Sequence, residues 1–338
     1  KKWDKRKRYE IYNDLKKINN EIVLTVAPHI YYNDNKLHPL SGISNSETIN
    51  CNENGYYSIY KSDRYGFNNP DEEWDKNEIQ YLLVGDSFTQ GHCVNRPNDI
   101  GSILRILSNK SVLNLGYGGN GPLIEYALLR EYLNSNVNKV LWLYSEGNDL
   151  TNLAKSKKNK VLINYLNDLN FSQNLKFRQN EINDLAIDKI EKQKKRKKES
   201  DNLKFSQFIK IYNLRNIVLH AKPPVVEPES ATLEEFKKII DLADRLVKKN
   251  NSKLYFVYLP VYGRFNTDVQ DMKYINKKYY DVIKKIVIEL NIPFIDISKE
   301  VFEKEENPLI FFPFESRGHY NIEGYKKVTE AIYKNTKN

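Results

Sequence analysis

Cysteine and histidine are scarce in this sequence of 338 residues, which holds only two cysteines, Cys51 and Cys93, and five histidines. It contains no Cys-x-x-Cys pair and no closely paired histidines, which are the spacings typical of zinc sites. The sequence therefore predicts neither a bound metal nor a cofactor. On composition alone, the two cysteines are either buried thiols or one disulfide, and thiols are the simpler interpretation.

Long hydrophobic runs are also missing. No stretch approaches the ~18 apolar residues that a transmembrane helix needs, and no signal peptide is recognisable. The sequence starts at Lys1 with the charged segment KKWDKRKRYE, which would suit the flank of a membrane anchor. We therefore leave open an upstream signal or anchor, and with it a position close to a membrane.

Negative charge is in the minority, with 44 Asp and Glu against 53 Lys and Arg and a formal net charge of +9. Such a balance favours acidic partners such as nucleic acid, anionic lipid or acidic glycans. The basic residues are spread along the chain, however, which is more typical of a coding bias toward Lys, Asn, Ile and Tyr. The one dense run, EKQKKRKKESD, is typical of a solvated helix or insertion, with a lid or an anionic-surface contact as the alternative. No nucleic-acid recognition motif accompanies this run, so we expect no nucleic-acid partner.

Apolar runs and amphipathic segments alternate from residue 79 onward. The runs typical of buried parallel strands are IQYLLV, SVLNLG, KVLWLYS, KLYFVYLP and PFIDIS. This alternation predicts an α/β fold of three layers, α/β/α, around a central, mostly parallel five-stranded sheet. We expect residues 76–338 to form this domain, interrupted at 151–211 by a basic helical insertion that is a candidate lid. Residues 1–75 are expected to be an extension that packs on the core and is irregular apart from a short helix.

Four segments at predicted strand ends or loops carry residues suited to nucleophilic catalysis. In GDSFTQG, a sharp turn from strand to helix would place Ser87 at a helix N-terminus, where free N–H groups favour developing negative charge, with Asp86 capping or bracing the turn. The other segments are NLGYGGNGP, SEGND and FFPFESRGHYNIEGY, the last of which contains His319. Each segment alone is equally typical of an ordinary turn or helix cap. Their coincidence in this order is what supports a site in which His319 serves as base for Ser87.

Taken in order, GDSFTQG, NLGYGGNGP, EGND and GHYNIEGY resemble the four sequence blocks of the SGNH (GDSL-type) hydrolase superfamily. The resemblance implies an SGNH/flavodoxin-like fold, with Ser87 as the nucleophile and His319 as the general base. It further implies that the oxyanion is held by the backbone amides of Ser87 and Gly119, with Gly118 as the near alternative, and by the side chain of Asn148.

One position departs from that pattern. Family members usually carry an Asp three residues before the histidine, and this chain has Ser316 there. Three explanations remain: a Ser–His dyad whose imidazole is oriented by a backbone carbonyl, an acid supplied by Glu315 or Asp296, or a weakened enzyme. We favour the dyad, because the third member of a triad mainly fixes the tautomer and orientation of the imidazole, which a carbonyl can also do.

The segment CNENGYYSIYKSDRYGFNNP and the cysteine beside the first block also resemble a bacterial, envelope-associated subgroup of these proteins. That resemblance implies an N-terminal segment tied to the core, and so strengthens the case for a Cys51–Cys93 disulfide. A disulfide implies an oxidising compartment. We therefore expect a periplasmic or envelope-associated protein, with a cytoplasmic location left open.

These residues together predict a serine esterase or acylhydrolase acting on an O-acyl ester, most simply an O-acetyl ester, of a carbohydrate or lipid. Its partner would be a small-molecule or glycan ester. The same residues would suit an O-acyltransferase that modifies a cell-envelope polysaccharide, because the two reactions differ only in how water is excluded. A non-catalytic glycan-binding protein of the same fold is the third alternative, since 24 tyrosines provide rings that stack on sugars.

Overall fold

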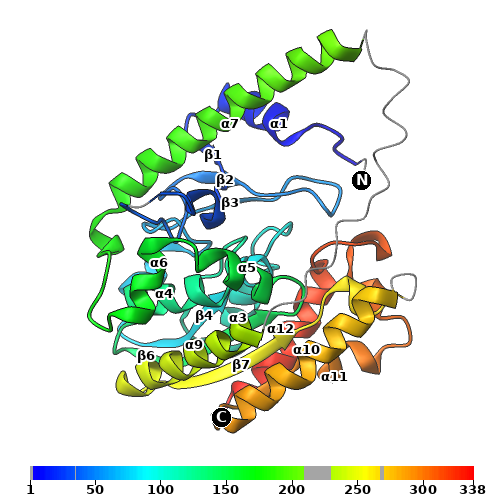
Figure 1. Ribbon diagram of the computed structural model, residues 1–338. Helices are drawn as coiled ribbons and strands as arrows, with labels where there is room; N and C mark the ends of the chain where they lie inside the picture. The colour runs from blue at the N-terminus through cyan, green and yellow to red at the C-terminus, as the bar shows by residue number, and fades with distance from the viewer. Residues whose placement is uncertain (1–2, 35, 209–229, 267–269) are drawn as a thin grey trace.

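The computed structural model describes residues 3–34, 36–208, 230–266 and 270–338. Its central strands are β4 (Ile79–Gly85), β5 (Val112–Asn114), β6 (Val137–Ser145), β7 (Lys253–Leu259) and β8 (Phe294–Asp296). They form one parallel sheet in the order β5-β4-β6-β7-β8, in the lower half of Figure 1. All five strands coincide with the apolar runs of the sequence. The prediction of an α/β fold with a parallel five-stranded sheet is therefore confirmed.

Helices cover both faces of this sheet, because alternate residues of a strand point to opposite sides. In β4, Tyr81 and Leu83 enter one apolar cluster, whereas Leu82 and Val84 enter another. The first cluster includes side chains of α3 (Ile100–Ser108) and α12 (Ile322–Thr336), and the second includes side chains of α4 (Pro122–Tyr132), α9 (Ser230–Lys249) and α10 (Gln270–Glu289). With both faces covered, the strand ends are the part of the sheet left for a site.

The strand order reverses at β4, which has β5 on one side and β6 on the other. Loops that leave neighbouring strands at such a switch point open a crevice between them, and ligands bind there. The segments GDS, NLGYGGNG and SEGND follow β4, β5 and β6. The topology thus collects three of the four predicted segments at one edge of the sheet.

The N-terminal extension has more regular structure than the sequence indicated. It contains α1 (Arg8–Lys16) and a small sheet in which β1 (Ile22–Leu24) pairs in parallel with β2 (Glu47–Ile49), and β2 pairs antiparallel with β3 (Ile59–Lys61). The interpretation of this segment as irregular apart from one helix is therefore wrong. Strands of three residues are too short to show an alternating pattern, and tertiary packing decides their pairing.

The basic insertion packs against the extension. Its helices are α5 (Asp149–Ser156), α6 (Lys160–Asn167) and α7 (Gln179–Phe208), and residues 209–211 of the predicted insertion lie outside the described residues. Ala186 and Ile190 of α7 share one apolar cluster with Ile11 and Tyr12 of α1. Figure 1 shows α7 running alongside α1 at the top of the molecule. The apolar residues Ala186 and Ile190 therefore anchor the long basic helix α7 to the extension.

Short helices complete the described structure: α2 (Ser87–Gln90), α11 (Ile297–Glu300) and the 3-10 turns η1 (Pro28–Tyr31), η2 (Asp71–Asp75), η3 (Leu175–Phe177), η4 (Tyr262–Arg264), η5 (Phe302–Lys304), η6 (Pro308–Phe311) and η7 (Pro313–Glu315). None of the helices in the described ranges is long and apolar enough to cross a membrane.

Candidate active site

Ser87 opens the short helix α2 directly after β4. Asp86 caps this helix, and its carboxylate accepts a hydrogen bond from the Phe88 amide at 2.9 Å. Gly85 allows the tight exit from the strand, because a Cβ there would lie 2.1 Å from the hydroxyl oxygen of Thr89. Ser87 is only 7% exposed. The central strand therefore presents this hydroxyl at the switch point of the sheet, held by a capped turn.

His319 faces Ser87 from the loop that leads into α12. Its Nε2 lies 2.7 Å from Ser87 Oγ, within hydrogen-bond distance. Asn321 caps α12 by accepting a hydrogen bond from the Gly324 amide at 2.9 Å, and its Nδ2 donates to the Ile310 carbonyl at 2.7 Å. These bonds hold the loop, so the imidazole is placed where a general base must be.

The acid partner of His319 is Glu53, from the N-terminal extension. Its Oε1 and Oε2 lie 3.0 and 3.1 Å from His319 Nδ1, and Oε2 also accepts a hydrogen bond from the His319 backbone amide at 2.6 Å. Burial raises the pKa of Glu53, but the hydrogen bonds and charge of His319 outweigh burial, and the pKa lies below its usual value. A charged carboxylate at Nδ1 selects the tautomer whose Nε2 accepts a proton from Ser87. The expectation of a dyad oriented by a backbone carbonyl is therefore wrong.

The two acids that the sequence offered as substitutes are engaged elsewhere. Glu315 accepts a hydrogen bond from Asn307 Nδ2 at 3.2 Å. Asp296 caps α11 and accepts a hydrogen bond from the Tyr280 hydroxyl. Ser316 donates from its hydroxyl to a backbone carbonyl at 3.1 Å. The carboxylate of this site therefore comes from a separate chain segment and not from the histidine loop.

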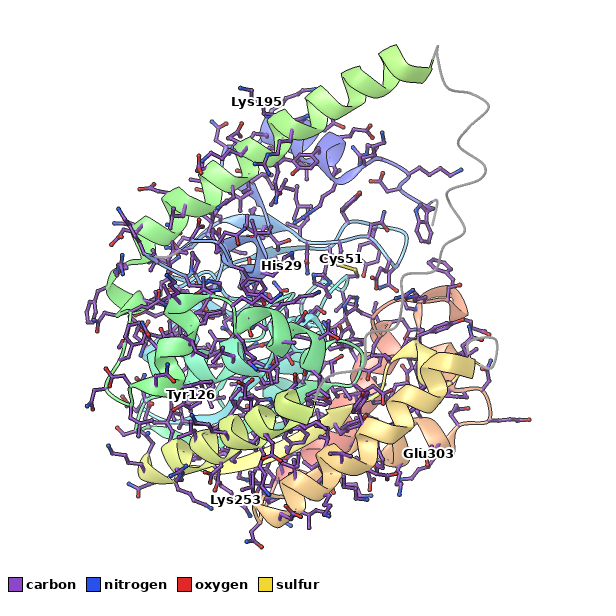
Figure 2. The ribbon with its side chains drawn as sticks, viewed as in Figure 1. His29, Cys51, Tyr126, Lys195, Lys253 and Glu303 are labelled. Atoms are coloured by element: carbon purple, nitrogen blue, oxygen red, sulfur yellow. A yellow bond between two sulfur atoms is a disulfide. The ribbon has the colours of Figure 1, made fainter. Side chains whose placement is uncertain are left out.

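A disulfide between Cys51 and Cys93 holds the Glu53 segment against the core. The two Cα atoms lie 4.9 Å apart, and Figure 2 shows Cys51 on the side of the extension that faces the core. Asn54 adds a hydrogen bond from Nδ2 to the Cys93 carbonyl at 3.0 Å. Gly318 leaves room for the acid, since a Cβ there would lie 2.8 Å from Glu53 Oε2. The pairing implied by the family resemblance is thus present, and it fixes the segment that carries the acid.

Two glycines of the loop after β5 line the same cavity as Ser87. The Gly118 amide donates to Gln90 Oε1 at 2.8 Å, whereas the Gly119 amide donates to no acceptor among the described residues. Gly119 has a φ of +87°, and a Cβ there would lie 2.6 Å from His29 Nδ1. Of the two glycines, Gly119 therefore has the amide that remains free to bind an oxyanion.

Asn148 is the N-cap of α5, in the short loop that follows β6, and is half-buried. Burial raises the pKa of Asp86, and the side chain of Asn148 is among the neighbouring groups that oppose this rise. The structure thus brings Asn148 next to the residue that precedes Ser87, at the same edge of the sheet.

Asp86 belongs to a group of three buried carboxyl groups. Burial raises the pKa of Asp86. Burial and the charge of Asp86 raise the pKa of Glu125 well above its usual value, and burial and the charges of Glu125 and Asp86 do the same for Asp149. These groups therefore hold protons more firmly than exposed carboxyl groups do.

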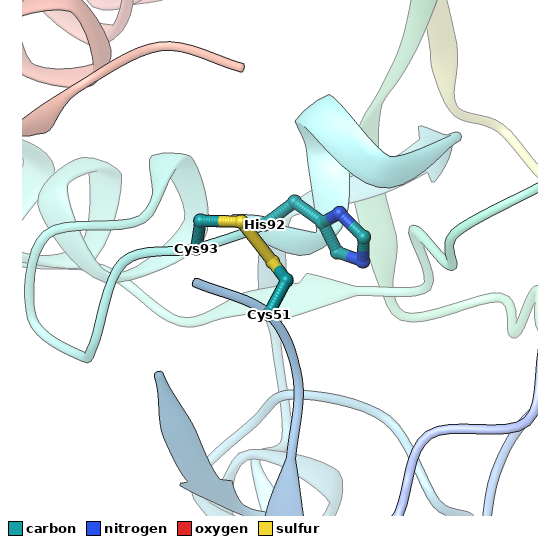
Figure 3. A group of neighbouring side chains, drawn as sticks. All are labelled: Cys51, His92 and Cys93. Carbon is teal, nitrogen blue, oxygen red and sulfur yellow. A yellow bond between two sulfur atoms is a disulfide. The ribbon is translucent and has the colours of Figure 1, made fainter. Parts of the chain in front are cut away.

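A second histidine, His92, lies beside His319. The His92 and His319 ring centroids are 4.7 Å apart in an edge-to-face contact. Burial, and then the charge of His319, lower the pKa of His92 well below its usual value, so its ring is neutral. Ligand atoms of Cys51, His92 and Cys93 lie within 4.8 Å of one another. Figure 3 shows both sulfur atoms joined in the disulfide, which offers no thiolate to a metal.

Sequence reasoning missed Glu53 and His92. Glu53 is separated from His319 by 266 residues, and the one signal near it is its place two residues after a cysteine. His92 stands next to the other cysteine. A search for titratable residues flanking the cysteine pair would have found both.

Comparison with known proteins shows which family the chain matches. The model of the GDSL-like lipase/acylhydrolase family matches residues 81–332. No curated protein matches the sequence.

Similar solved structures include a lipolytic protein of the G-D-S-L family from Desulfitobacterium hafniense, at 15% identity and a TM-score of 0.42, covering 76% of this chain and 99% of that one. A member of the same family from Veillonella parvula has 12% identity and a TM-score of 0.41, covering 76% of this chain and 97% of that one. An acetylxylan esterase from Geobacillus stearothermophilus has 16% identity and a TM-score of 0.41, covering 77% of this chain and 96% of that one.

The family match spans well over half of the chain and contains Ser87, Gly119, Asn148 and His319, while Glu53 lies before it. The chain therefore belongs to the GDSL-like lipase/acylhydrolase family, whose members are ester hydrolases.

Proposed function

We propose that this protein is a serine esterase that uses Ser87, His319 and Glu53 as a catalytic triad. Its substrate is an O-acyl ester, most simply an O-acetyl ester, of a carbohydrate or lipid. The observation that carries the proposal is the line of contacts from Ser87 Oγ to His319 Nε2 at 2.7 Å and from His319 Nδ1 to Glu53 at 3.0 Å.

In the proposed reaction, Ser87 Oγ attacks the acyl carbonyl carbon as its proton passes to His319 Nε2. The amides of Ser87 and Gly119 hold the oxyanion, with the Asn148 side chain as the third donor. The bond to the alcohol then breaks, and the alcohol leaves with the proton from His319. Water repeats the sequence on the acyl-enzyme and releases the acid.

Glu53 supplies the carboxylate that is missing at position 316, where this chain has Ser316. The carboxylate stabilises the imidazolium that forms when His319 takes the Ser87 proton. A complete triad supports an active esterase over a weakened enzyme or a glycan-binding protein.

The disulfide between Cys51 and Cys93 bears on location. Stable disulfides form in oxidising compartments and are rare in the cytosol. We therefore propose that the protein works in the periplasm or cell envelope.

The test combines a substitution with an active-site label. We expect Ser87→Ala to lower hydrolysis of p-nitrophenyl acetate by at least about a thousandfold, and a fluorophosphonate probe to label Ser87 in the wild type. Thr151→Ala, an exposed change in α5, is the matched control. An active Ser87→Ala protein, or a label on another residue, would contradict the proposal.

The same assay separates hydrolysis from acyl transfer. Acetate released without any acceptor sugar supports the esterase. Acetyl groups that appear only on an added polysaccharide would identify the protein as an O-acyltransferase instead.

A further inference from the structure

The cavity in front of Ser87 is built by three parts of the chain. It has a volume of about 370 Å³ and is lined by Ser87, Gln90 and Gly119 of the core, by Arg8 and His29 of the extension and by Gln193 of α7. None of its described lining residues is acidic. The wall that faces the nucleophile is therefore neutral or positive.

Arg8 supplies the positive charge of this wall. Its Nη2 donates to the carbonyl oxygens of Thr25 and Ile49 at 2.9 and 3.2 Å, and also to the Thr25 hydroxyl. All three acceptors are neutral. The Nε atom of Arg8 is buried and donates to no described residue.

The strongest charge effects on Arg8 come from tyrosines, namely Tyr117, Tyr9, Tyr60 and Tyr57, and no carboxylate of the described residues forms an ion pair with its guanidinium. Burial lowers the pKa of Arg8, yet a guanidinium stays protonated in proteins. Charges withdrawn from water are normally paired. Arg8 therefore carries a charge that the described residues leave uncompensated beside the nucleophile.

Neighbouring groups extend this positive side of the cavity. The Tyr9 hydroxyl donates to Gln193 Oε1 at 3.1 Å, which leaves the Gln193 amide nitrogen as a donor. The charge of Lys155 acts on His29, whose pKa is lowered by burial and by that charge. A ligand in the cavity thus has the Gln193 amide as a donor in addition to Arg8.

We propose that this cavity binds an anionic group, a carboxylate or a phosphate, on the alcohol part of the ester substrate, with Arg8 as its main partner. The inference rests on the proposed function and adds the substrate class, which is acylated acidic sugars in preference to neutral ones. The planar fork of a guanidinium matches the paired oxygens of either group. Because Arg8 and Ser87 line one cavity, the anion and the ester belong to the same sugar unit or to adjacent ones.

Equilibrium binding to the full chain tests this without any turnover. Calorimetry with glucuronate, glucose 6-phosphate and glucose should show at least one anionic sugar binding about tenfold or more tighter than glucose, as expected for a charge-assisted contact. Whichever of glucuronate and glucose 6-phosphate binds more tightly identifies the preferred anionic group as a carboxylate or a phosphate.

Arg8→Gln should remove this preference. Arg6→Gln is the matched control, because Arg6 lies on the same segment, is exposed and pairs with Asp4 and Asp14. Arg8→Gln also loses the contacts with Thr25 and Ile49, so melting curves accompany each variant. If Arg8→Gln melts at a lower temperature than the wild type, Arg8→Lys provides the test, because it keeps the positive charge but loses the planar guanidinium. Its preference for the anionic sugar over glucose should be at least threefold weaker than that of the wild type.

Equal binding of glucose and both anionic sugars in the wild type would overturn the proposal. A preference that persists undiminished in folded Arg8→Gln or Arg8→Lys protein would overturn it too. Because free sugars are not hydrolysed, this result is independent of the esterase assay. A protein that binds glucuronate but lacks esterase activity would contradict the proposed function alone.

Discussion

The parallel sheet and the N-terminal extension contribute different chemistry to one site. The ends of β4, β5 and β6 carry Ser87, Gly119 and Asn148, the groups proposed to attack the acyl carbon and hold the oxyanion. The extension carries Glu53, which lies behind the base, and Arg8, which lies in the cavity wall. The sheet thus arranges the reacting atoms, and the extension supplies the charges around them.

The two regions are also held by different means. Hydrogen bonds between paired parallel strands fix the sheet, whereas a disulfide, side-chain hydrogen bonds and two apolar clusters, one shared with the core and one with α7, hold the extension. The difference teaches that reaction geometry and charge can be changed separately in this protein. Three variants, taken from the largest expected effect to the smallest, examine that separation.

Glu53→Gln should lower kcat/KM for p-nitrophenyl acetate by roughly ten-thousandfold, the loss seen when a triad loses its acid. The amide no longer stabilises the imidazolium and allows the wrong tautomer. Glu315→Gln, which changes the acid that the sequence suggested, should stay within about twofold of the wild type.

A double-mutant cycle sharpens this result. If Glu53 acts only through the base, then Glu53→Gln has no further effect in a His319→Ala background. A further large loss there would show that the extension contributes to catalysis independently of His319.

Removing the disulfide should affect both stability and activity. In the chain-entropy model, closing a loop between cysteines that are 42 positions apart is worth about 4 kcal/mol. The double variant Cys51→Ser, Cys93→Ser should therefore unfold at lower denaturant concentration. It should also lose roughly tenfold in kcat, because Glu53 is less well held. Full activity in a destabilised variant would restrict the disulfide to a structural role.

Glu125→Gln tests how a buried carboxyl group of the core affects stability, and it has the smallest expected effect of the three variants. The raised pKa of Glu125 means that the folded protein keeps a proton that the unfolded chain releases above about pH 4.3. Wild-type stability therefore falls as the pH rises from that value toward the folded pKa, and the glutamine avoids this loss.

Melting temperatures across pH 4 to 8 measure this effect. The advantage of Glu125→Gln should be absent near pH 4 and reach roughly 2–4 °C at pH 8. Glu305→Gln, an exposed change, is the control and should show no such trend. A constant difference at all pH values would mean that the substitution acts through packing.

The contrast between the parallel sheet and the N-terminal extension also explains which parts of the structure the sequence could predict. The strands and the helices between them leave patterns of apolar residues, and parallel topology then places Ser87, Gly119 and Asn148 at one edge. His319 is indicated because it follows a glycine in the loop that leads into a helix capped by Asn321. These inferences need only local pattern and general topology.

The extension offered no such pattern. Its strands have three residues each, and its key contacts are side-chain contacts with distant segments. Glu53 looks like any acid in a polar loop, and Arg8 looks like part of a charged run. Their roles depend on which side chains meet after folding, and periodicity carries no information on that.

The distance along the chain between Glu53 and His319 has a consequence for biosynthesis. The two residues lie 266 positions apart, and domains begin to form while the chain is still being made. The acid is among the first parts of the site to leave the ribosome, and its partner is among the last. Every stage of synthesis between Ser87 and His319 therefore holds the proposed nucleophile without its base, and the site is completed only when α12 docks.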